Sequence, residues 1–305
     1  MLHDPAHPSV AARIGARPRR VLVILNPAAR AAGSARWPAV LEALSRHGCE
    51  VTVRTTAGPG DATRFAVEVR AGDYDVVAIA GGDGTINEAL DGLGEGVAMV
   101  AIVPLGTANV AALEIGLSLD AEAVARAIAG GRAERAHLGR VNGRSFLMMA
   151  GAGFDAAVVA AVRPGIKRRL GRWAYVLESA RLLFRYRPQA LTVTVDGAVH
   201  QAASVVIGNG HFYGGRFVCT PDARLEEAGF QVCLGLGMGR LSIVRYAAAL
   251  GLGILPRLRD VRLLRARRIR IDGPAGAPVQ ADGEIVARLP VDIDVAPRTI
   301  RLLHP

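Results

Sequence analysis

The stretch Val76-Val77-Ala78-Ile79-Ala80-Gly81-Gly82-Asp83-Gly84-Thr85 decides the fold of this chain. Its first five residues are continuously apolar and partly β-branched, which is typical of a strand buried on both faces of a parallel sheet. The glycines that follow let the backbone turn sharply and let a ligand approach it closely. A helical pattern resumes at residues 86–90, with Thr85 as a candidate N-cap. The sequence therefore predicts a strand, a glycine turn and a helix N-terminus, in that order.

This turn also predicts chemistry. Between a buried strand and a helix N-terminus, backbone amides point at one spot and favour a phosphate group there. Asp83 lies at the tip of the turn. A carboxylate beside phosphates is chemically reasonable when a Mg²⁺ ion bridges them, or when the carboxylate orients a hydroxyl group. For this stretch taken alone, an ordinary strand-to-helix turn with a solvated Asp stays open as the alternative.

The first part of the chain alternates strands with helices. Apolar runs predict strands at 21–25, 51–55, 76–80 and 100–103, and helical patterns cover 37–47, 62–70, 110–115 and 121–129. This alternation predicts a parallel sheet with helices on both faces, a fold that binds ligands at the carboxyl ends of its strands. Loops begin after these strands at Asn26, Thr56, Gly81 and Gly106, so we expect the four loops to meet at one edge of the sheet.

Beyond about residue 134 the pattern changes to short strands separated by turn residues. Strand-like runs occur at 146–149, 191–195, 203–207, 230–234, 267–271 and 291–295, and helices are expected at about 172–186 and 241–252. This pattern predicts a mainly antiparallel β-sandwich of two packed sheets. The expected fold class is thus α/β plus β, with a flexible tail at 1–19 and domains at 20–135 and 136–305.

The amino-acid composition indicates which cellular compartment and which kind of binding partner to expect. The 305 residues carry 37 Lys and Arg against 27 Asp and Glu, a formal charge of +10. A strongly basic chain favours an acidic partner, such as an anionic membrane, nucleic acid or a polyanionic substrate. The cysteines are too few and too widely spaced for a disulfide framework, which favours a reducing compartment. Residues 1–20 lack a signal-peptide core, so a cytoplasmic location is expected.

Taken together, the motifs resemble those of the diacylglycerol kinase catalytic domain family, which includes soluble bacterial diacylglycerol kinases, related lipid kinases, sphingosine kinases and ceramide kinases. The glycine turn, in 81–88, is similar to the family signature. Further similar motifs follow in the family's order: 26–27, Thr56 with 58–62, 104–109, 151–155, 171–175, Asn209, 214–215, Pro221 with Ala223, and 282–284. The resemblance spans roughly 20–305 and implies an ATP-binding domain at 20–135, a lipid-binding domain at 136–305 and a cleft between them.

The resemblance also implies site residues. Contacts with ATP and its Mg²⁺ are expected from Asn26, Thr56, Gly81, Gly82, Asp83, Gly84, Thr85, Asn87, Glu88 and Thr107. Glu284 is implied as the general base that takes the proton of the acceptor hydroxyl, with Asp83 as a second catalytic carboxylate. From the residues alone, turn capping by Thr56 and Thr107 and a solvated turn position for Glu284 stay open as alternatives.

Two departures from the family pattern concern metal binding. Val110 stands where the family usually has Asp, directly after Asn109. The family's bacterial branch also holds a structural Mg²⁺ in a loop that corresponds to 224–229 here. Residue-by-residue transfer places that ion at the carbonyls of Arg224 and Gly229 and at the carboxylate of Glu227. Because Glu is longer than Asp and Ala228 replaces Gly, retention of this second metal site stays open.

Residues 163–187 combine many basic side chains with aromatic and aliphatic ones. Such a stretch is typical of a helix that lies on an anionic membrane surface, although a helix packed on its own domain with solvated arginines explains it equally well. Nucleic acid is not expected, because no stacking platform or DNA-binding motif accompanies the charge.

The sequence therefore predicts an ATP-dependent lipid kinase that associates peripherally with an anionic membrane and phosphorylates diacylglycerol or a sphingoid-like lipid. A kinase of a soluble substrate, similar to NAD kinases, and a non-catalytic lipid-binding protein stay as alternatives. The acceptor lipid and the choice between a monomer and a homodimer are left open by the sequence.

Overall fold

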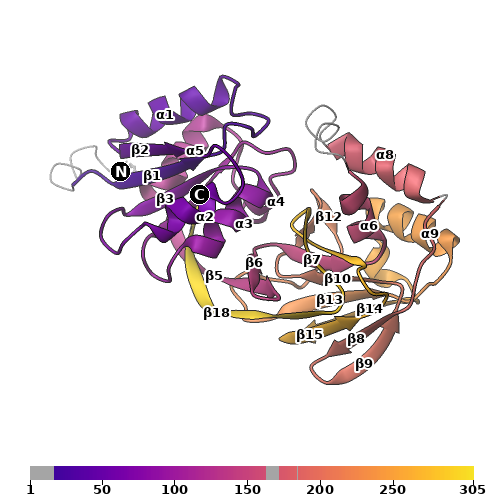
Figure 1. The fold of residues 1–305 in the computed structure, drawn as a ribbon. Coiled ribbons are helices and arrows are strands. Elements are labelled where there is room, and N and C mark those ends of the chain that lie inside the picture. The colour runs from indigo at the N-terminus through magenta and orange to yellow at the C-terminus, as the bar shows by residue number, and fades with distance from the viewer. Residues whose placement is uncertain (1–16, 163–171, 184) are drawn as a thin grey trace, which may run out of the picture.

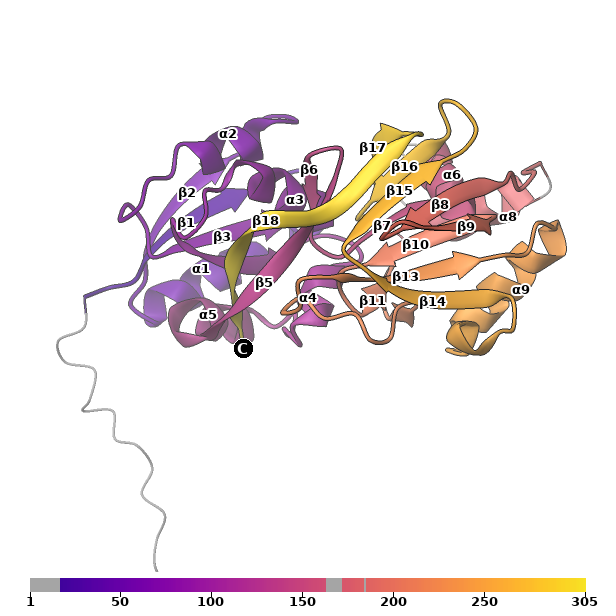
Figure 2. The ribbon, with the colours of Figure 1, turned by 90° about the horizontal axis from the view of Figure 1, so that it is seen from below.

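The computed structural model describes residues 17–162, 172–183 and 185–305. Most of the tail expected at 1–19 therefore lies outside the described residues, as does much of the basic stretch at 163–187. The chain forms two lobes bridged by two long strands, β5 (Arg132–Val141) and β18 (Val291–His304) (Figures 1 and 2). These strands pair antiparallel with each other over most of their length, so the lobes share a continuous backbone connection.

The first lobe is built on four parallel strands in the order β2-β1-β3-β4. Their bounds are β1 Arg20–Leu25, β2 Glu50–Thr55, β3 Val76–Gly81 and β4 Met99–Pro104. The central strand β3 is buried along its whole length, as its apolar sequence requires. The covering helices are α1 (Arg36–Arg46), α2 (Asp61–Val67), α3 (Asp83–Gly92), α4 (Val110–Glu114) and α5 (Ala121–Gly130). The predicted parallel-sheet domain is confirmed.

One sheet runs through both lobes. β18 pairs with β4 at Leu302 and Val100, and at its other end it pairs with β15 (Arg268–Asp272). The sheet continues through β8 (Leu191–Val195) to its edge at β9 (Ala198–Ala202), and β6 (Arg144–Phe146) pairs with β5. β18 thereby holds the second lobe at a fixed place beside the carboxyl-end loops of the first.

A second, antiparallel sheet packs against this extension. Its strands lie in the order β14-β13-β10-β7-β16-β17. Their bounds are β14 Val261–Ala266, β13 Phe230–Gly235, β10 Ser204–Gly208, β7 Met149–Ala152, β16 Pro278–Ala281 and β17 Glu284–Arg288. Buried side chains from both sheets, among them Val193, Ile207, Val232 and Ile293, form a common core. The predicted β-sandwich is confirmed.

Short elements complete the outer end of the second lobe. They are the helices α6 (Phe154–Ala161), α8 (Arg172–Leu183) and α9 (Arg240–Gly251) and the 3-10 helix η2 (Leu255–Arg257). The hairpin of β11 (Phe212–Tyr213) with β12 (Phe217–Val218) extends from α4 of the first lobe to α9, because β11 contacts α4 and β12 contacts α9. Figure 1 shows α6, α8 and α9 grouped at the end of the lobe farthest from the parallel strands. Among the helices of the described residues, none has both the length and the apolar content needed to cross a membrane.

The structure corrects three local expectations. α3 begins at Asp83 with Gly82 as its N-cap, so Thr85 is a residue of the helix and not its cap. The single strand expected at 146–149 is two strands, β6 and β7, because the backbone amides of 147–149 turn toward a side chain instead of a neighbouring strand. α6 is a helix that the pattern did not predict, since its sequence FDAAVVAA is apolar on nearly every side.

Candidate active site

The glycine turn after β3 packs directly on the loop after β4. The amide of Leu105 donates to the carbonyl of Gly81 at 3.0 Å. A Cβ atom added to Gly106 would lie 2.5 Å from Cα of Gly82, and one added to Gly82 would lie 3.3 Å from Cα of Gly106. The two loops therefore meet backbone to backbone, as their place at neighbouring strand ends predicts. Only glycine leaves room for this approach.

Asn26 and Thr85 fix the turn from behind. Nδ2 of Asn26 donates to Oγ1 of Thr85 at 2.9 Å, and a Cβ atom on Gly81 would lie 2.6 Å from Cβ of Thr85. Thr56 is also buried, directly after β2, whereas Thr107 is exposed in the loop after β4. Asn26 and Thr85 thus hold the turn in shape, and Thr107 has the most open hydroxyl of these residues.

Asp83 begins α3 and connects it to α4. Its Oδ1 accepts a hydrogen bond from the amide of Ala111 at 3.2 Å. Burial and, to a lesser extent, the nearby negative charge of Asp282 together raise the pKa of Asp83 to about 6. Two carboxylates held close together at low solvent exposure favour a bound cation, which would neutralise their repulsion. Because four hydrogen-bond donors already hold the carboxylate of Asp282, Asp83 is the acidic side chain of the pair that would ligate a Mg²⁺ ion.

Asp282 joins the two lobes. It lies in the turn between β16 and β17 with a left-handed backbone, at φ 45°. Its carboxylate accepts hydrogen bonds from the amides of Leu147 (2.9 Å), Met148 (3.1 Å) and Met149 (2.8 Å), and from Nδ2 of Asn87 (2.9 Å). Burial raises the pKa of Asp282, although these hydrogen bonds act in the opposite direction. The turn is thereby anchored to α3.

Glu284, the first residue of β17, reaches the glycine turn from the other lobe. Its side chain is exposed, and a Cβ atom added to Gly84 would lie 2.1 Å from its Oε1. The carboxylate therefore occupies the space beside Gly84 that any larger residue would fill. The structure thus brings Glu284 and 81–84 together, although about 200 residues separate them in the sequence.

A second row of polar groups lies behind this turn. Oδ2 of Asp155 accepts a hydrogen bond from Nε2 of Gln280 at 3.2 Å, and Oε1 of Gln280 accepts one from the amide of Gly283 at 3.0 Å. Burial raises the pKa of Asp155 to about 6. Sequence reasoning missed Gln280, because a single Gln within a short strand carries no pattern that marks it.

Asn87 and Glu88 have structural partners. Oδ1 of Asn87 accepts from the amide of Leu147 at 3.2 Å, in addition to the bond that its Nδ2 donates to Asp282. Oε1 of Glu88 accepts from the amide of Ala62 at 3.1 Å and thereby ties α2 to α3. These contacts position α3, and direct nucleotide contact by either side chain stays a prediction.

The loop expected to hold a second metal ion borders a cavity of about 460 Å³. The carbonyl of Arg224 accepts from the amide of Glu227 at 3.2 Å, and Oε2 of Glu227 accepts from Arg265 at 3.2 Å. Two of the three predicted ligand groups, the carbonyl of Arg224 and the carboxylate of Glu227, thus already have a partner within the chain. The metal assignment at Arg224, Glu227 and Gly229 stays a prediction, and no catalytic step depends on it.

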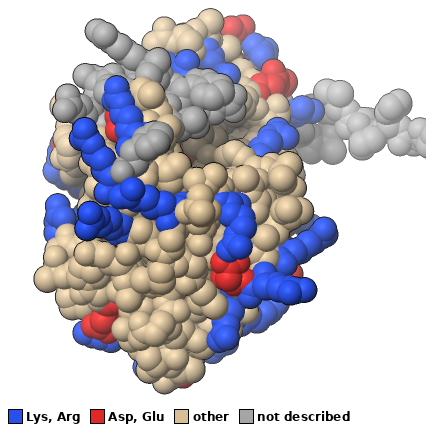
Figure 3. Space-filling model, turned by 90° about the vertical axis from the view of Figure 1, so that its right-hand side faces the viewer, with Lys and Arg blue, Asp and Glu red and all other residues tan. Residues whose placement is uncertain are grey.

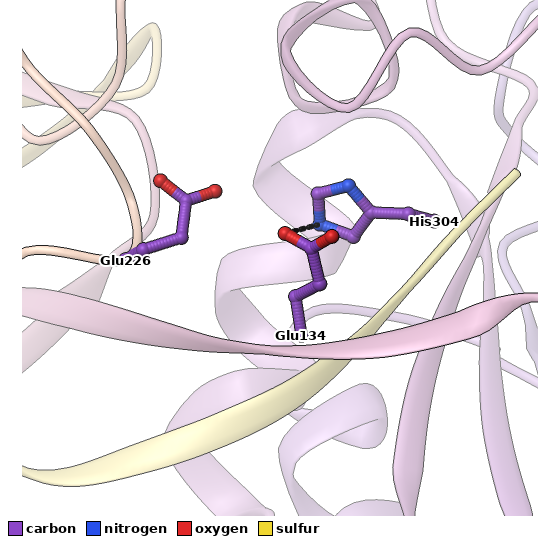
Figure 4. A group of neighbouring side chains, drawn as sticks. All are labelled: Glu134, Glu226 and His304. Atoms are coloured by element: carbon purple, nitrogen blue, oxygen red, sulfur yellow. Dashed lines mark ion pairs between the residues drawn. The ribbon is translucent and has the colours of Figure 1, made fainter.

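A separate group of possible ligands lies nearby, where Glu134, Glu226 and His304 approach one another from three segments (Figure 4). Nε2 of His304 lies 3.9 Å from Oε2 of Glu134, whose carboxylate also pairs with Arg132. Glu226 is exposed. Since Arg132 already neutralises one of the two carboxylates, the group is accounted for as a surface ion-pair cluster.

Comparison with known proteins agrees with this arrangement. Residues 20–141 match the diacylglycerol kinase catalytic domain, and residues 148–304 match the YegS C-terminal NAD kinase beta sandwich-like domain. The chain is 32% identical over 290 residues to a Pseudomonas aeruginosa protein named "Probable lipid kinase YegS-like", with 94% of each chain covered. It is 27% identical over 293 residues to the diacylglycerol kinase of Bacillus subtilis, covering 94% of this chain and 97% of the other.

A solved structure from Bacillus anthracis str. Sterne superposes with a TM-score of 0.80, at 23% identity, over 98% of this chain and 99% of that one. This likeness shows the same two-lobed fold. The family suggested by the ordered motifs is confirmed by the domain matches and by the Pseudomonas relative over almost the whole chain. The chain belongs to the diacylglycerol kinase family of lipid kinases.

Proposed function

We propose that this protein transfers the γ-phosphoryl group of ATP to a hydroxyl group of a membrane lipid, diacylglycerol or a sphingoid-like lipid, with Glu284 as general base. The observation that carries the proposal is the position of Glu284 beside Gly84. At this place the exposed carboxylate of Glu284, from the second lobe, lies beside the glycine turn of the first lobe, where phosphate would bind. The residues 20–135 would bind ATP, and 136–305 would bind the lipid.

The glycine turn would hold the phosphates of ATP. Amides at the N-terminus of α3 carry the positive end of the helix dipole, and the glycines at 82 and 106 let the loops after β3 and β4 pack backbone to backbone at this edge. Thr56 and Thr107 flank this edge, and Thr85 with Asn26 keeps its shape. Asp83 would hold the Mg²⁺, which when bound neutralises phosphate charge during transfer.

Glu284 would act on the acceptor. As the lipid oxygen forms its bond to the γ-phosphorus and the bond to the leaving ADP oxygen breaks, the hydroxyl proton moves to the carboxylate of Glu284. Asp282 would keep this carboxylate in place, because four hydrogen bonds fix the turn two residues before it. Gln280 would support the same turn through the amide of Gly283.

The acceptor lipid would come from an anionic membrane, which the formal charge of +10 favours. We propose a cytoplasmic protein that attaches to the membrane surface peripherally. Many exposed arginines of the second lobe, among them Arg185 and Arg187, support this proposal.

One assay tests this function against its alternatives. Purified protein is incubated with radiolabelled ATP and Mg²⁺ and, separately, with diacylglycerol, sphingosine, phosphatidylglycerol or NAD. The proposal predicts label in a lipid and none in NAD. Label in NAD alone would support a soluble-substrate kinase, an alternative favoured by the NAD kinase-like sandwich of the second domain. Lipid binding without any label would support a non-catalytic lipid-binding protein.

A further inference from the structure

Large apolar side chains that stay exposed gather at the outer end of the second lobe. Eleven such side chains occur among the described residues, and five of them lie between residues 238 and 254: Met238, Leu241, Val244, Leu252 and Ile254. Leu241 is 84% exposed and Leu252 is 74% exposed. We call these five residues the α9 face, since α9 provides two of them and the others flank it. Scattered exposed apolar residues are ordinary, but a cluster of them indicates a surface that binds a protein, a membrane or a ligand.

The helix that carries this face is held firmly in place. Ile243 and Ala249 are buried on its opposite side. The hydroxyl of Tyr246 accepts a hydrogen bond from the amide of Gly237 at 2.8 Å and donates one to Oδ2 of Asp260 at 2.6 Å. α9 therefore already has a side that packs on its own domain. Leu241 and Leu252 lie on the other side of the helix. They are therefore exposed although α9 is packed firmly on its own domain.

Basic side chains surround the α9 face. Six exposed arginines lie in segments that adjoin α9: Arg185, Arg187, Arg216, Arg240, Arg257 and Arg259. Of the acids close to them in the chain, Glu178 and Asp260 pair with Arg181 and Arg245, and Asp222 accepts a hydrogen bond from Nε2 of Gln231. Within the described ranges, none of the six arginines has an acidic partner. Figure 3 shows this side of the molecule, where blue side chains gather and red ones are few.

We propose that the α9 face docks on an anionic lipid bilayer, with α9 lying in the plane of the interface and Leu241 and Leu252 inserted among the acyl chains. An apolar helix face ringed by arginines has the composition of interfacial membrane helices, in which cations meet lipid phosphates while apolar side chains enter the hydrocarbon. A second copy of the chain is a poorer occupant, because two equally basic faces repel each other.

The inference rests on the proposed function, which requires a lipid from a bilayer. Its apolar contacts come from α9 and the residues beside it, whereas the basic stretch at 163–187 contributes only Arg185 and Arg187. α8 connects the two sites. It packs on α9, and the hydroxyl of Tyr175 in α8 donates to the carbonyl of Gly283 at 3.4 Å, beside the proposed base. Docking through α9 would therefore bring the bilayer to the lobe that carries Glu284.

Binding to vesicles of phosphatidylcholine mixed with phosphatidylglycerol tests the inference. Leu241→Asp and Leu252→Asp are each expected to lower the partition coefficient by about tenfold or more, because each removes an inserted side chain and adds a like charge to that of the lipid. Val67→Asp is the matched control, since Val67 is 65% exposed on α2 of the other lobe. Its binding should stay within about twofold of wild type. Thermal unfolding of all variants checks that the fold is intact.

Kinase assays separate this inference from the proposed function. The α9 variants should lose activity on vesicles but keep it on a short-chain diacylglycerol dispersed in solution. Loss of vesicle binding in the variants, with no lipid phosphorylated even by wild type, would support the docking face and refute the kinase proposal. If both α9 variants bound vesicles as strongly as wild type does, the docking face would be overturned, whatever their kinase activity. If wild type sedimented as a dimer and the α9 variants as monomers, with vesicle binding unchanged, the face would instead bind a second copy of the chain.

Discussion

The two acidic turns that meet at the lobe junction look alike in sequence but differ in surroundings. In the turn at 81–84, Asp83 is partly buried and accepts a hydrogen bond from Ala111. In the turn at 282–284, Asp282 is held by four donors, whereas Glu284 is exposed beside Gly84. Two of the three carboxylates therefore hold backbone in place and repel each other, and the third is open to an incoming hydroxyl. This difference supports the proposal that the first turn binds the cation and that Glu284 of the second turn accepts the proton.

The largest effect on ATP affinity is expected from Gly82→Val. The branched side chain would project toward Cα of Gly106 and push apart the two loops that form the proposed phosphate site, so ATP affinity should fall by at least about 100-fold. Isothermal titration calorimetry measures the change. Gly130→Val is the control, because a Cβ atom at residue 130 meets nothing within 4 Å. Unchanged ATP affinity in a folded Gly82→Val protein would contradict the phosphate site.

Asp83→Asn should weaken the binding of ATP with Mg²⁺ by about tenfold and lower the rate as well, since the amide cannot neutralise a cation. The binding of ATP without Mg²⁺ should change little. The pKa of Asp83 lies at about 6, so wild-type Mg²⁺-dependent affinity should fall as the pH drops below 6 and the carboxylate becomes protonated. The variant should lack this dependence. Equal pH profiles for the two proteins would rule out Asp83 as the cation ligand.

Asp282→Ala should lower the free energy of unfolding by about 3 kcal/mol or more, because it leaves the amides of Leu147, Met148 and Met149 without their acceptor. Asp196→Ala is the matched control. Asp196 has the same φ of 45° and also accepts from backbone amides, but it is exposed. Its loss should cost less than about 1 kcal/mol. Equal losses in urea unfolding would mean that the junction does not depend on Asp282.

A smaller effect on stability than that of Asp282→Ala is expected at Asp155. Burial raises its pKa from 3.8 to about 6, so the folded protein binds this proton more tightly than the unfolded chain does. The contribution of Asp155 to the free energy of unfolding is therefore fully present below about pH 4 and is lost as the pH rises through 6. Between pH 4 and pH 7, wild type should lose about 1–3 kcal/mol of unfolding free energy through this group. Asp155→Asn should not show this loss, because its amide does not titrate. Urea unfolding at several pH values measures it, and identical pH profiles would count against the assignment.

The sequence predicted the first lobe more closely than the second. Strands such as β3 are uniformly apolar because both faces are buried, and this pattern is readable without the fold. β18 was expected to end at residue 295 but continues to His304, because its final residues pair with β5 and β4 of the other lobe. Partners that far away in the chain leave no local pattern.

The site shows the same contrast. The convergence of Gly82 and Gly106 followed from their place after adjacent parallel strands. The role of Glu284 was implied by family resemblance, and its place against Gly84 came from the fold. The anchoring of Asp282 to 147–149, the link through Gln280 and the exposed α9 face all depend on tertiary packing. No periodicity or motif in the sequence marks them.

The central claim is that Glu284 takes the proton of the acceptor hydroxyl, and the kcat of Glu284→Gln tests it most directly. The amide keeps the shape of the side chain but cannot accept a proton. On a lipid that wild type phosphorylates, kcat should fall by about 10²–10⁴, while ATP affinity and thermal stability stay close to wild type. Full activity of Glu284→Gln on that lipid would contradict the claim and leave Asp83 as the better candidate for the base.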